Sequence, residues 1–406
     1  MAANMKLRFL ETLRQSIFAY AFNIFGVVAG ATLAYHIGMF SLAPWVVAVY
    51  PSVVSARGVI GGLFSGRLST GLHLGMVKPH FFGNTEDFYL LLKAIVVMTL
   101  ETSIAMSLVA ALFGSIFQSI TAAEVLNMLT VTMATMTLAL VCISPLTMAI
   151  SFASFTHGLD PDIVLYPIES TVSDLAITAI YISFVNLFLL FGSFGQYVTI
   201  SACLVLLFAA AYLLPKNLRK PQFAETLREF VITLVFVAFI VNVTGFALSK
   251  IAGAIGGRKE IYTVYPAMID TMGDVGAVVG STATTKLALG LLKPSFLSIK
   301  EHATEISGAW AASLIMFLVY SAISLVVQGL FSLTNLLGFA ALLINANLIA
   351  GFFIIVVSYA VAILTHQRGL DPDNFVIPIE SSLADSLTTI SLLIALSLFG
   401  GLGAAA

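Results

Sequence analysis

Two stretches decide the fold of this chain: DPDIVLYPIESTVSDLAIT at residues 160–178 and DPDNFVIPIESSLADSLTT at residues 371–389. They are nearly the same apolar run, written again 211 residues later (371 − 160), and each carries a glutamate and an aspartate in its interior. In both, Asp-Pro suits the cap and first turn of a helix, and a later proline removes one backbone hydrogen bond. The runs therefore predict a duplicated, kinked helix with buried acids.

The composition around these runs is that of a membrane protein. Charged residues make up 9% of the 406 residues and hydrophobic residues 59%, with a mean hydropathy of +1.04. Soluble domains carry roughly 25% charged residues, so this chain could not cover itself with polar surface. We predict an all-α, polytopic membrane protein. The net charge of −2 says nothing about partners, and no basic patch with interleaved aromatic residues suggests nucleic acid.

About eleven membrane-spanning helices are predicted, because a span needs about 20 mostly apolar residues. The glycine-rich stretches 40–75 and 262–290 leave broken helices open as an alternative. The predicted spans are 16–40, 43–66, 86–116, 122–152, 162–194, 197–214, 226–250, 262–290, 303–332, 335–364 and 373–399.

The two halves of the chain match in order and spacing. FLETLR at 9–14 recurs as FAETLR at 223–228, and VYPSVVSARGVIG from residue 49 recurs as VYPAMIDTMGDVG from residue 264, an offset of 215 (264 − 49). We predict three parts: a first five-helix repeat at 1–195, a linker helix and basic loop at 196–222, and a second five-helix repeat at 223–406.

The linker span makes the two repeats parallel. A repeat of five spans ends on the side of the membrane opposite to the one where it began, and one further crossing brings the chain back, so the second repeat begins on the same side as the first. Positive charges support this arrangement and predict a cytoplasmic amino terminus and an outer carboxyl terminus. Only Lys250, Arg258 and Lys259 fall on the predicted outer side. The predicted inner side holds Lys6, Arg8, Arg14, Arg67, Lys78, Lys216, Arg219, Lys220, Arg228, Lys286, Lys293, Lys300 and Arg368.

The intramembrane acids are the candidate functional residues. An unpaired acid at the bilayer centre costs about 2.5–3.5 kcal/mol, and residues 161–195 and 372–399 contain no lysine or arginine. A mobile cation is the simplest source of the missing positive charge, and hard oxygen donors suit Mg²⁺ or Ca²⁺. The predicted metal-binding residues are Asp174, Asp385, Glu169, Glu380, Asp270, Asp274, Ser170 and Ser381.

Structural interpretations stay open for several of these residues. The acids of the duplicated helix could be protonated hydrogen-bonding groups, and the two Asp-Pro-Asp motifs favour helix starts over ligands. Arg57 has Met272 as its counterpart and is expected to be an internal counter-charge to one acid. Asp270 and Asp274 either mark where the cation enters or pair with Arg57. Gly58, Gly61, Gly62 and Gly66 are expected to let helices approach closely.

The duplicated pattern resembles the MgtE-type membrane domain, and more closely its duplicated relatives in solute carrier family 41. The resemblance rests on RLSTGLH at 67–73, the proline-then-glycine second spans, and the kinked helices with DPD…P-x-E-S…D. It implies two five-helix units about a two-fold axis, with a cation pathway between them and pore aspartates at Asp174 and Asp385. The polar second-span motif of the family maps onto Gly58-Val59 and Gly273-Asp274, so the first copy lacks its polar residue.

The leading hypothesis is therefore a transporter or channel for magnesium or another divalent cation, in the cell membrane, with the ion as substrate and no cofactor. It is not expected to be an enzyme. One chain would supply both halves of the pathway, so that a monomer replaces a homodimer. A Na⁺- or H⁺-coupled carrier with sites at Glu169 and Glu380 is the alternative. An intramembrane aspartyl protease is a remote one, suggested by Met272-Gly273-Asp274.

Overall fold

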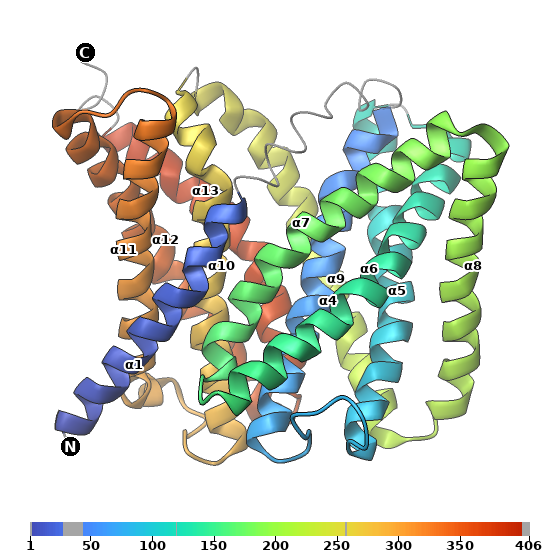
Figure 1. The fold of residues 1–406 in the computed structure, drawn as a ribbon, viewed down its shortest axis with the longest axis horizontal. Helices are drawn as coiled ribbons and strands as arrows, with labels where there is room; N and C mark the ends of the chain where they lie inside the picture. Colours follow the sequence, from blue (N-terminus) through green and yellow to red (C-terminus); the bar gives the residue numbers. More distant parts are fainter. Residues whose placement is uncertain (1, 27–43, 119, 256–257, 400–406) are drawn as a thin grey trace.

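The computed structural model describes residues 2–26, 44–118, 120–255 and 258–399, which form helices joined by short loops without a strand in those ranges (Figure 1). In chain order the elements are α1 (Ala2–Tyr20), η1 (Ala21–Phe25), α4 (Pro44–His73), α5 (Glu86–Gln118), α6 (Ala122–Thr156), α7 (Pro161–Leu190), α8 (Gly192–Asn217), α9 (Pro221–Ile255), α10 (Lys259–Ala288), η2 (Phe296–Glu301), α11 (Ala303–Val327), α12 (Leu333–Gln367), η3 (Pro372–Asn374) and α13 (Val376–Phe399).

Seven segments within the described ranges are long and apolar enough to cross a membrane: α5, α6, α7, α8, α11, α12, and η3 taken together with α13. The prediction of an all-α, polytopic membrane protein is confirmed. The count of eleven spans stays a prediction, and the predicted span 16–40 extends past residue 26 into a part that lies outside the described residues.

Four helices form the centre of the molecule: α4 and α7 from the first half, and α10 and α13 from the second. Equivalent contacts recur in the two halves. The Tyr50 hydroxyl lies 2.9 Å from Oγ1 of Thr178, and the Tyr265 hydroxyl lies 2.6 Å from Oγ1 of Thr389. These pairs are related by the offsets of 215 and 211 found in the sequence. The sequence duplication is therefore also a duplication of contacts.

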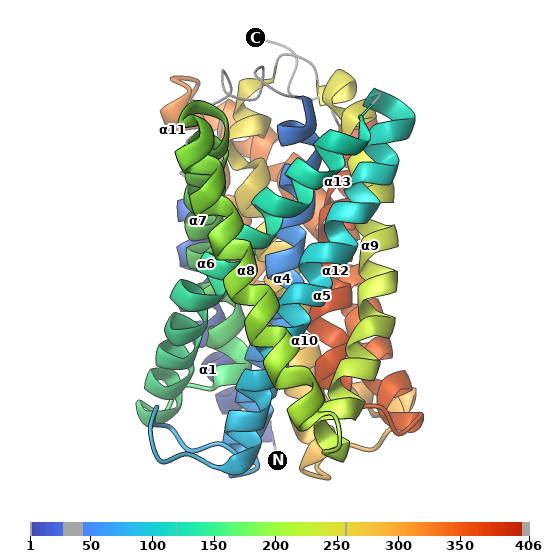
Figure 2. The same cartoon turned by 90° about the vertical axis from the view of Figure 1, so that its right-hand side faces the viewer.

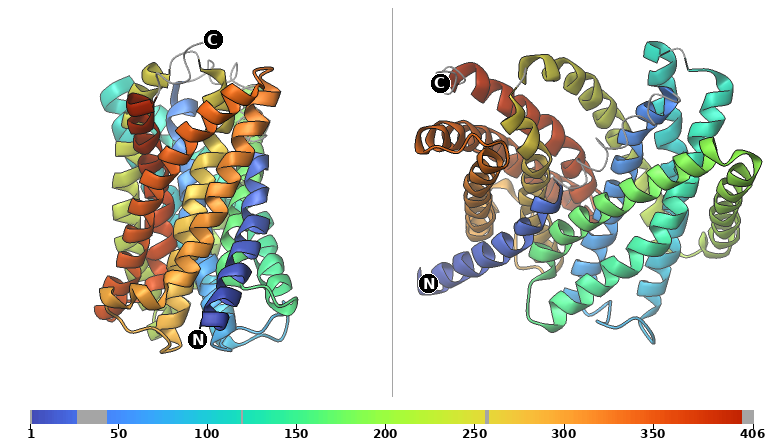
Figure 3. Two further views of the ribbon diagram at one scale, coloured as in Figure 1. Left: turned by 90° about the vertical axis from the view of Figure 1, so that its left-hand side faces the viewer. Right: turned by 45° about the horizontal axis from the view of Figure 1, so that its top comes forward.

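The first helix of each half packs against the other half (Figures 1 and 3). Helix α1 lies along α11, where the backbone of Gly308 meets the side chain of Thr12 and the Tyr320 hydroxyl donates to the Tyr20 carbonyl oxygen at 3.2 Å. In the same way, α9 packs against α5 of the first half as well as against α13. This exchange ties the two halves together around the four central helices.

The linker helix α8 lies at the edge of the molecule, against α5, α6 and α7, and crosses from one face to the other (Figure 2). Its outward side carries exposed apolar side chains such as Phe194, Val205 and Phe208, as expected for a surface in contact with lipid. One polar contact fixes it, from the Cys203 thiol to the Thr130 carbonyl oxygen at 2.9 Å. Its position agrees with a connecting role.

The glycine-rich stretches are continuous helices where the structure describes them, so the alternative of broken helices is wrong for α4 and α10. Close contact was predicted at four of the glycines, and the structure shows it at three of them. Gly61 faces the Glu169 carboxylate, Gly62 faces Ile377, and Gly66 faces Asp373. Gly58 has open space where a Cβ atom would stand.

Candidate cation site

A cavity of about 90 Å³ lies between the two halves, and four carboxylates line it: Asp174, Asp270, Asp274 and Asp385. We call it the central cavity. Six of the eight predicted site residues line it, since Ser170 and Ser381 stand beside these acids. The wall also includes Val54, Ser55, Arg57, Gly58, Tyr166, Ile269, Gly273, Ser382 and Ala384.

Helical spacing explains why these side chains share one wall. In α7, Ser170 and Asp174 are four residues apart, which places them one above the other on a single face. Ser381 and Asp385 repeat this spacing in α13, and Asp270 and Asp274 repeat it in α10. Three helices from both halves thus turn a polar face toward the same space, although each is apolar over most of its length.

Arg57 is the internal counter-charge that the sequence predicted, and its main partner is Glu169. Its guanidinium contacts the Glu169 carboxylate directly and donates to the Glu169 carbonyl oxygen at 3.1 Å. A second nitrogen lies 3.7 Å from Oδ1 of Asp174. Arg57 is 4% exposed and Glu169 is fully buried. Glu169 also takes part in contacts with Thr147 and Ser173, at 3.3 and 3.1 Å, and stands outside the central cavity.

Glu380, the counterpart of Glu169, has no such partner. Met272 occupies the position equivalent to Arg57. Neither carboxylate oxygen of Glu380 has a hydrogen-bonding partner in the described part of the chain, and the side chain is 2% exposed. It packs against Gly276, as Glu169 packs against Gly61. The two halves therefore hold the same buried acid in different electrostatic surroundings.

Asn23 is a polar residue near the central cavity that the sequence reasoning missed. It lies in η1, and its side-chain amide donates to Oδ2 of Asp274 at 2.6 Å and to Oγ1 of Thr271 at 3.0 Å. A single asparagine in an apolar stretch was the available signal. The recorded ion pairs of Arg57 are with Glu169 and Asp174, so the alternative in which Asp270 or Asp274 pairs with Arg57 finds no support among the described residues.

The Asp-Pro-Asp motifs start helical segments as predicted. The side chain of Asp160 accepts a hydrogen bond from the Asp162 amide at the start of α7, and Asp371 does the same for Asp373 at the start of η3. Burial, reinforced by the charge of Asp162, raises the pKa of Asp160 to about 7. Pro378 has no N–H to donate to the carbonyl four residues earlier, that of Asn374, and this carbonyl instead accepts a hydrogen bond from the Thr233 hydroxyl at 2.8 Å.

A second cavity, of about 440 Å³, lies nearer the face that carries the amino terminus, and we call it the vestibule. Arg67, Thr70, Thr226 and Asp371 are among its lining residues. Arg67 joins the halves here. Its Nη1 lies 2.6 Å from Oδ2 of Asp371, and its other nitrogens donate to Asn374 at 3.1 Å and to Thr226 at 3.0 Å.

A small apolar cluster of buried side chains borders the central cavity, since one of its members, Tyr166, lines that cavity. Its members are Tyr166, Ala277 and Ile377, and all three are buried. Along α13 and the segment before it, the order is Asp371 in the vestibule, Ile377 in the cluster, and Ser381 in the central cavity. Tyr166 and Ile377 are equivalent at the offset of 211, so both halves contribute one large side chain to this cluster.

Two solved structures of similar length align over nearly the whole chain at low similarity. One is described as a crystal structure of MATE in complex with Br-NRF, with 10% identity, 98% coverage of both chains and a TM-score of 0.47. The other is described as the outward-facing conformation of a multidrug resistance MATE family transporter of the MOP superfamily, with 11% identity, 99% coverage of both chains and a TM-score of 0.40. At these scores neither says anything about the function of this chain.

The sequence comparison is more informative. No curated protein sequence matches the chain. A sequence model of the MgtE family, described as divalent cation transporters, matches it twice, over residues 50–184 and 265–395. The two matched segments cover most of the equivalent central helices of the two halves and contain all eight predicted site residues. The chain therefore belongs to the MgtE family of divalent cation transporters.

Proposed function

We propose that the chain transports Mg²⁺ through a pathway that passes through the central cavity. The observation that carries this proposal is the convergence of Asp174, Asp270, Asp274 and Asp385, from both halves, on one cavity. Arg57 stands in the same wall among the described residues, but its charge is already offset by Glu169, so the four aspartates, when ionised, leave up to four negative charges without a full counter-charge. A divalent cation would neutralise half of this charge.

The size of the central cavity favours a hydrated ion. A water molecule needs about 10–15 Å³ of cavity volume, so the central cavity of about 90 Å³ accommodates roughly six water-sized positions. Mg²⁺ gives up its water reluctantly and is held by one or two carboxylates while it keeps several waters. Serine hydroxyls and carboxylates around a wet space suit this ion better than a tight cage of protein ligands would.

The proposal gives each of the eight predicted site residues a role. Asp174, Asp385, Asp270, Asp274, Ser170 and Ser381 would contact the ion or its waters, whereas Glu169 and Glu380 would support the helices around it. We propose that one chain supplies both halves, with repeats at 1–195 and 223–406 and the linker at 196–222. The amino-terminal face would be cytoplasmic. The coupled-carrier alternative is not favoured, because Arg57 already neutralises Glu169.

Transport is tested with the purified protein in vesicles that contain a magnesium-sensitive dye. We expect saturable Mg²⁺ uptake driven by an inside-negative potential, and uptake that persists without a Na⁺ or pH gradient. Vesicles without protein provide the baseline, and Ca²⁺ and Mn²⁺ are offered in parallel to rank the ions. Uptake that requires an imposed Na⁺ or pH gradient would favour the coupled carrier, and no divalent flux under any condition would refute the proposal.

The apolar cluster predicts a second result. We propose that Tyr166, Ala277 and Ile377 exclude water between the two cavities, since hydrophobic constrictions close pores by dewetting. Replacing Ile377 by serine is expected to raise Mg²⁺ uptake several-fold in the same vesicle assay. Ile163→Ser, the same change at a buried position of α7 outside this cluster, serves as the control. Equal effects of the two substitutions would rule out a gating role for the cluster.

A further inference from the structure

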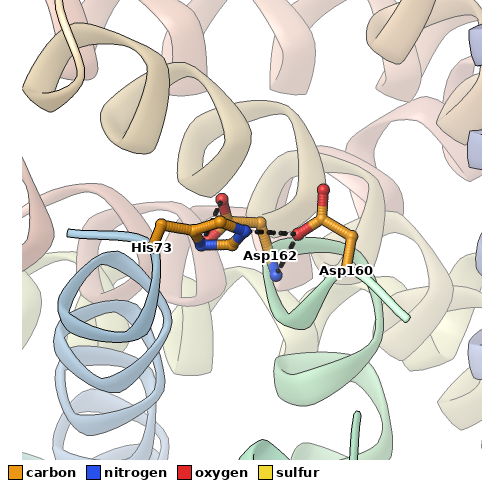
Figure 4. Close-up of side chains that lie close together, drawn as sticks. All are labelled: His73, Asp160 and Asp162. Atoms are coloured by element: carbon orange, nitrogen blue, oxygen red, sulfur yellow. Dashed lines mark hydrogen bonds and ion pairs between the residues drawn. The ribbon is translucent and has the colours of Figure 1, made fainter. Parts of the chain in front are cut away.

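A second group of metal-ligand side chains lies away from the central cavity, at the amino-terminal face. His73 is the last residue of α4, and Asp160 and Asp162 stand at the start of α7 (Figure 4). One ligand atom from each lies within 4.8 Å of the others. Ligand atoms held 2.0–2.2 Å from one metal ion are at most about 4.4 Å apart, so a shift of less than about 1 Å would bring all three onto one ion.

The imidazole of His73 is already arranged as a metal ligand. Its Nδ1 lies 3.0 Å from the Ser69 carbonyl oxygen, which can only accept, so Nδ1 carries the proton and donates. Its Nε2 faces Oδ1 of Asp160 at 3.6 Å, too far for a hydrogen bond. Histidines that bind metals are typically held in this way, with one nitrogen donating to a backbone carbonyl and the other free to ligate.

Asp162 is oriented by hydroxyl groups from both halves of the protein. Its Oδ1 accepts hydrogen bonds from Ser69 of α4 and, at 2.8 Å, from Ser281 of α10. Its Oδ2 lies 3.9 Å from Nδ1 of His73 (Figure 4). The residue is 4% exposed. The hydroxyl groups thus hold one oxygen of this buried carboxylate and fix the direction of the other, next to the His73 ring.

The second half of the chain shows what the equivalent acids do when a fixed cation is present. There, Asp371 and Asp373 replace Asp160 and Asp162, and Nη1 of Arg67 lies 2.6 Å from Asp371. The counterpart of Arg67 at the offset of 215 is Thr282, so no guanidinium is available to the first pair from that position. The recorded ion-pair partner of Asp160 and Asp162 within the described ranges is His73.

We propose that His73, Asp160 and Asp162 form a second metal site, for a divalent transition-metal ion such as Mn²⁺, Co²⁺ or Zn²⁺. One imidazole nitrogen with two carboxylates favours such ions over Mg²⁺, for which oxygen ligands are preferred. The site is distinct from the central cavity. Asp162 and Asp174 are twelve residues apart in α7 (174 − 162), or about 18 Å at 1.5 Å per residue. The inference does not depend on the proposed transport function.

Co²⁺ alone, added to the full-length protein after treatment with a chelator, tests the site. Bound Co²⁺ has visible absorption bands that report nitrogen ligation and coordination number. We expect the wild-type protein to bind Co²⁺ with a nitrogen-ligated component and His73→Ala to lose at least tenfold in affinity for it. His80→Ala, at an exposed histidine in the loop after α4, is the matched control and should bind as the wild type does.

Two more variants keep the result unambiguous. Asp174→Asn with Asp385→Asn removes acids of the central cavity and should leave the nitrogen-ligated component intact, which separates this site from the transport site. Asp160→Asn tests the cluster through a partly exposed residue if His73→Ala does not fold. Unchanged Co²⁺ spectra in both cluster variants, or loss of all Co²⁺ binding in the central-cavity variant, would overturn the proposal.

Discussion

Replacing Asp174 and Asp385 together by asparagine is expected to abolish divalent cation uptake in vesicles, by at least 100-fold, while the protein still folds. Both side chains line the central cavity, and each substitution removes a full negative charge at almost constant shape. A loss of 100-fold corresponds to about 2.7 kcal/mol. This is less than the gross attraction of about 4 kcal/mol between unit charges 4 Å apart at an effective dielectric constant of 20.

The fold should survive, because removing buried charges lowers the cost of placing these helices in the membrane. Glu101→Gln is the control, since Glu101 is an acid of α5 that stands outside the central cavity. The single variants should differ. Arg57 lies 3.7 Å from Asp174 and already offsets part of its charge, so Asp385→Asn is expected to cost more uptake than Asp174→Asn. Normal uptake by a correctly folded double variant would remove these aspartates from the pathway.

Arg57→Met is expected to destabilise the protein by about 3–5 kcal/mol, the usual cost of leaving one member of a buried ion pair without its partner. Arg57 is 4% exposed, and its guanidinium contacts the Glu169 carboxylate and backbone oxygen. Methionine is chosen because Met272 occupies the equivalent position in the second half. The measurement is thermal unfolding of the purified protein in detergent.

A second substitution distinguishes charge from packing. Adding Glu169→Gln to Arg57→Met removes the unpaired charge and should recover most of the lost stability. Met272→Leu, at the equivalent position of the second half, is the matched control, and a volume-conserving change of this kind costs less than about 1.5 kcal/mol. If Glu169→Gln gave no recovery, the role of Arg57 would lie in packing and not in charge compensation.

The sequence by itself determined the class of protein and its internal duplication. Hydropathy is additive along the chain, so long apolar segments identify a membrane protein without knowledge of how they pack. The repeat is visible because both copies kept the same helix starts and acids, such as Asp160 with Asp174 and Asp371 with Asp385. Helical spacing then placed Ser170 and Asp174 on one face, as the structure has them.

Only the tertiary structure decided which of these residues meet. A helix that is apolar all round gives no sign of which face turns inward, so the sequence could not tell that Asp274 meets Asn23, or that Glu169 and Glu380 stand outside the central cavity. The tertiary structure also brought His73 next to Asp160 and Asp162, although His73 is far from both aspartates in the chain. Contacts between helices depend on their rotation and crossing, and these are set by the packing of the whole molecule.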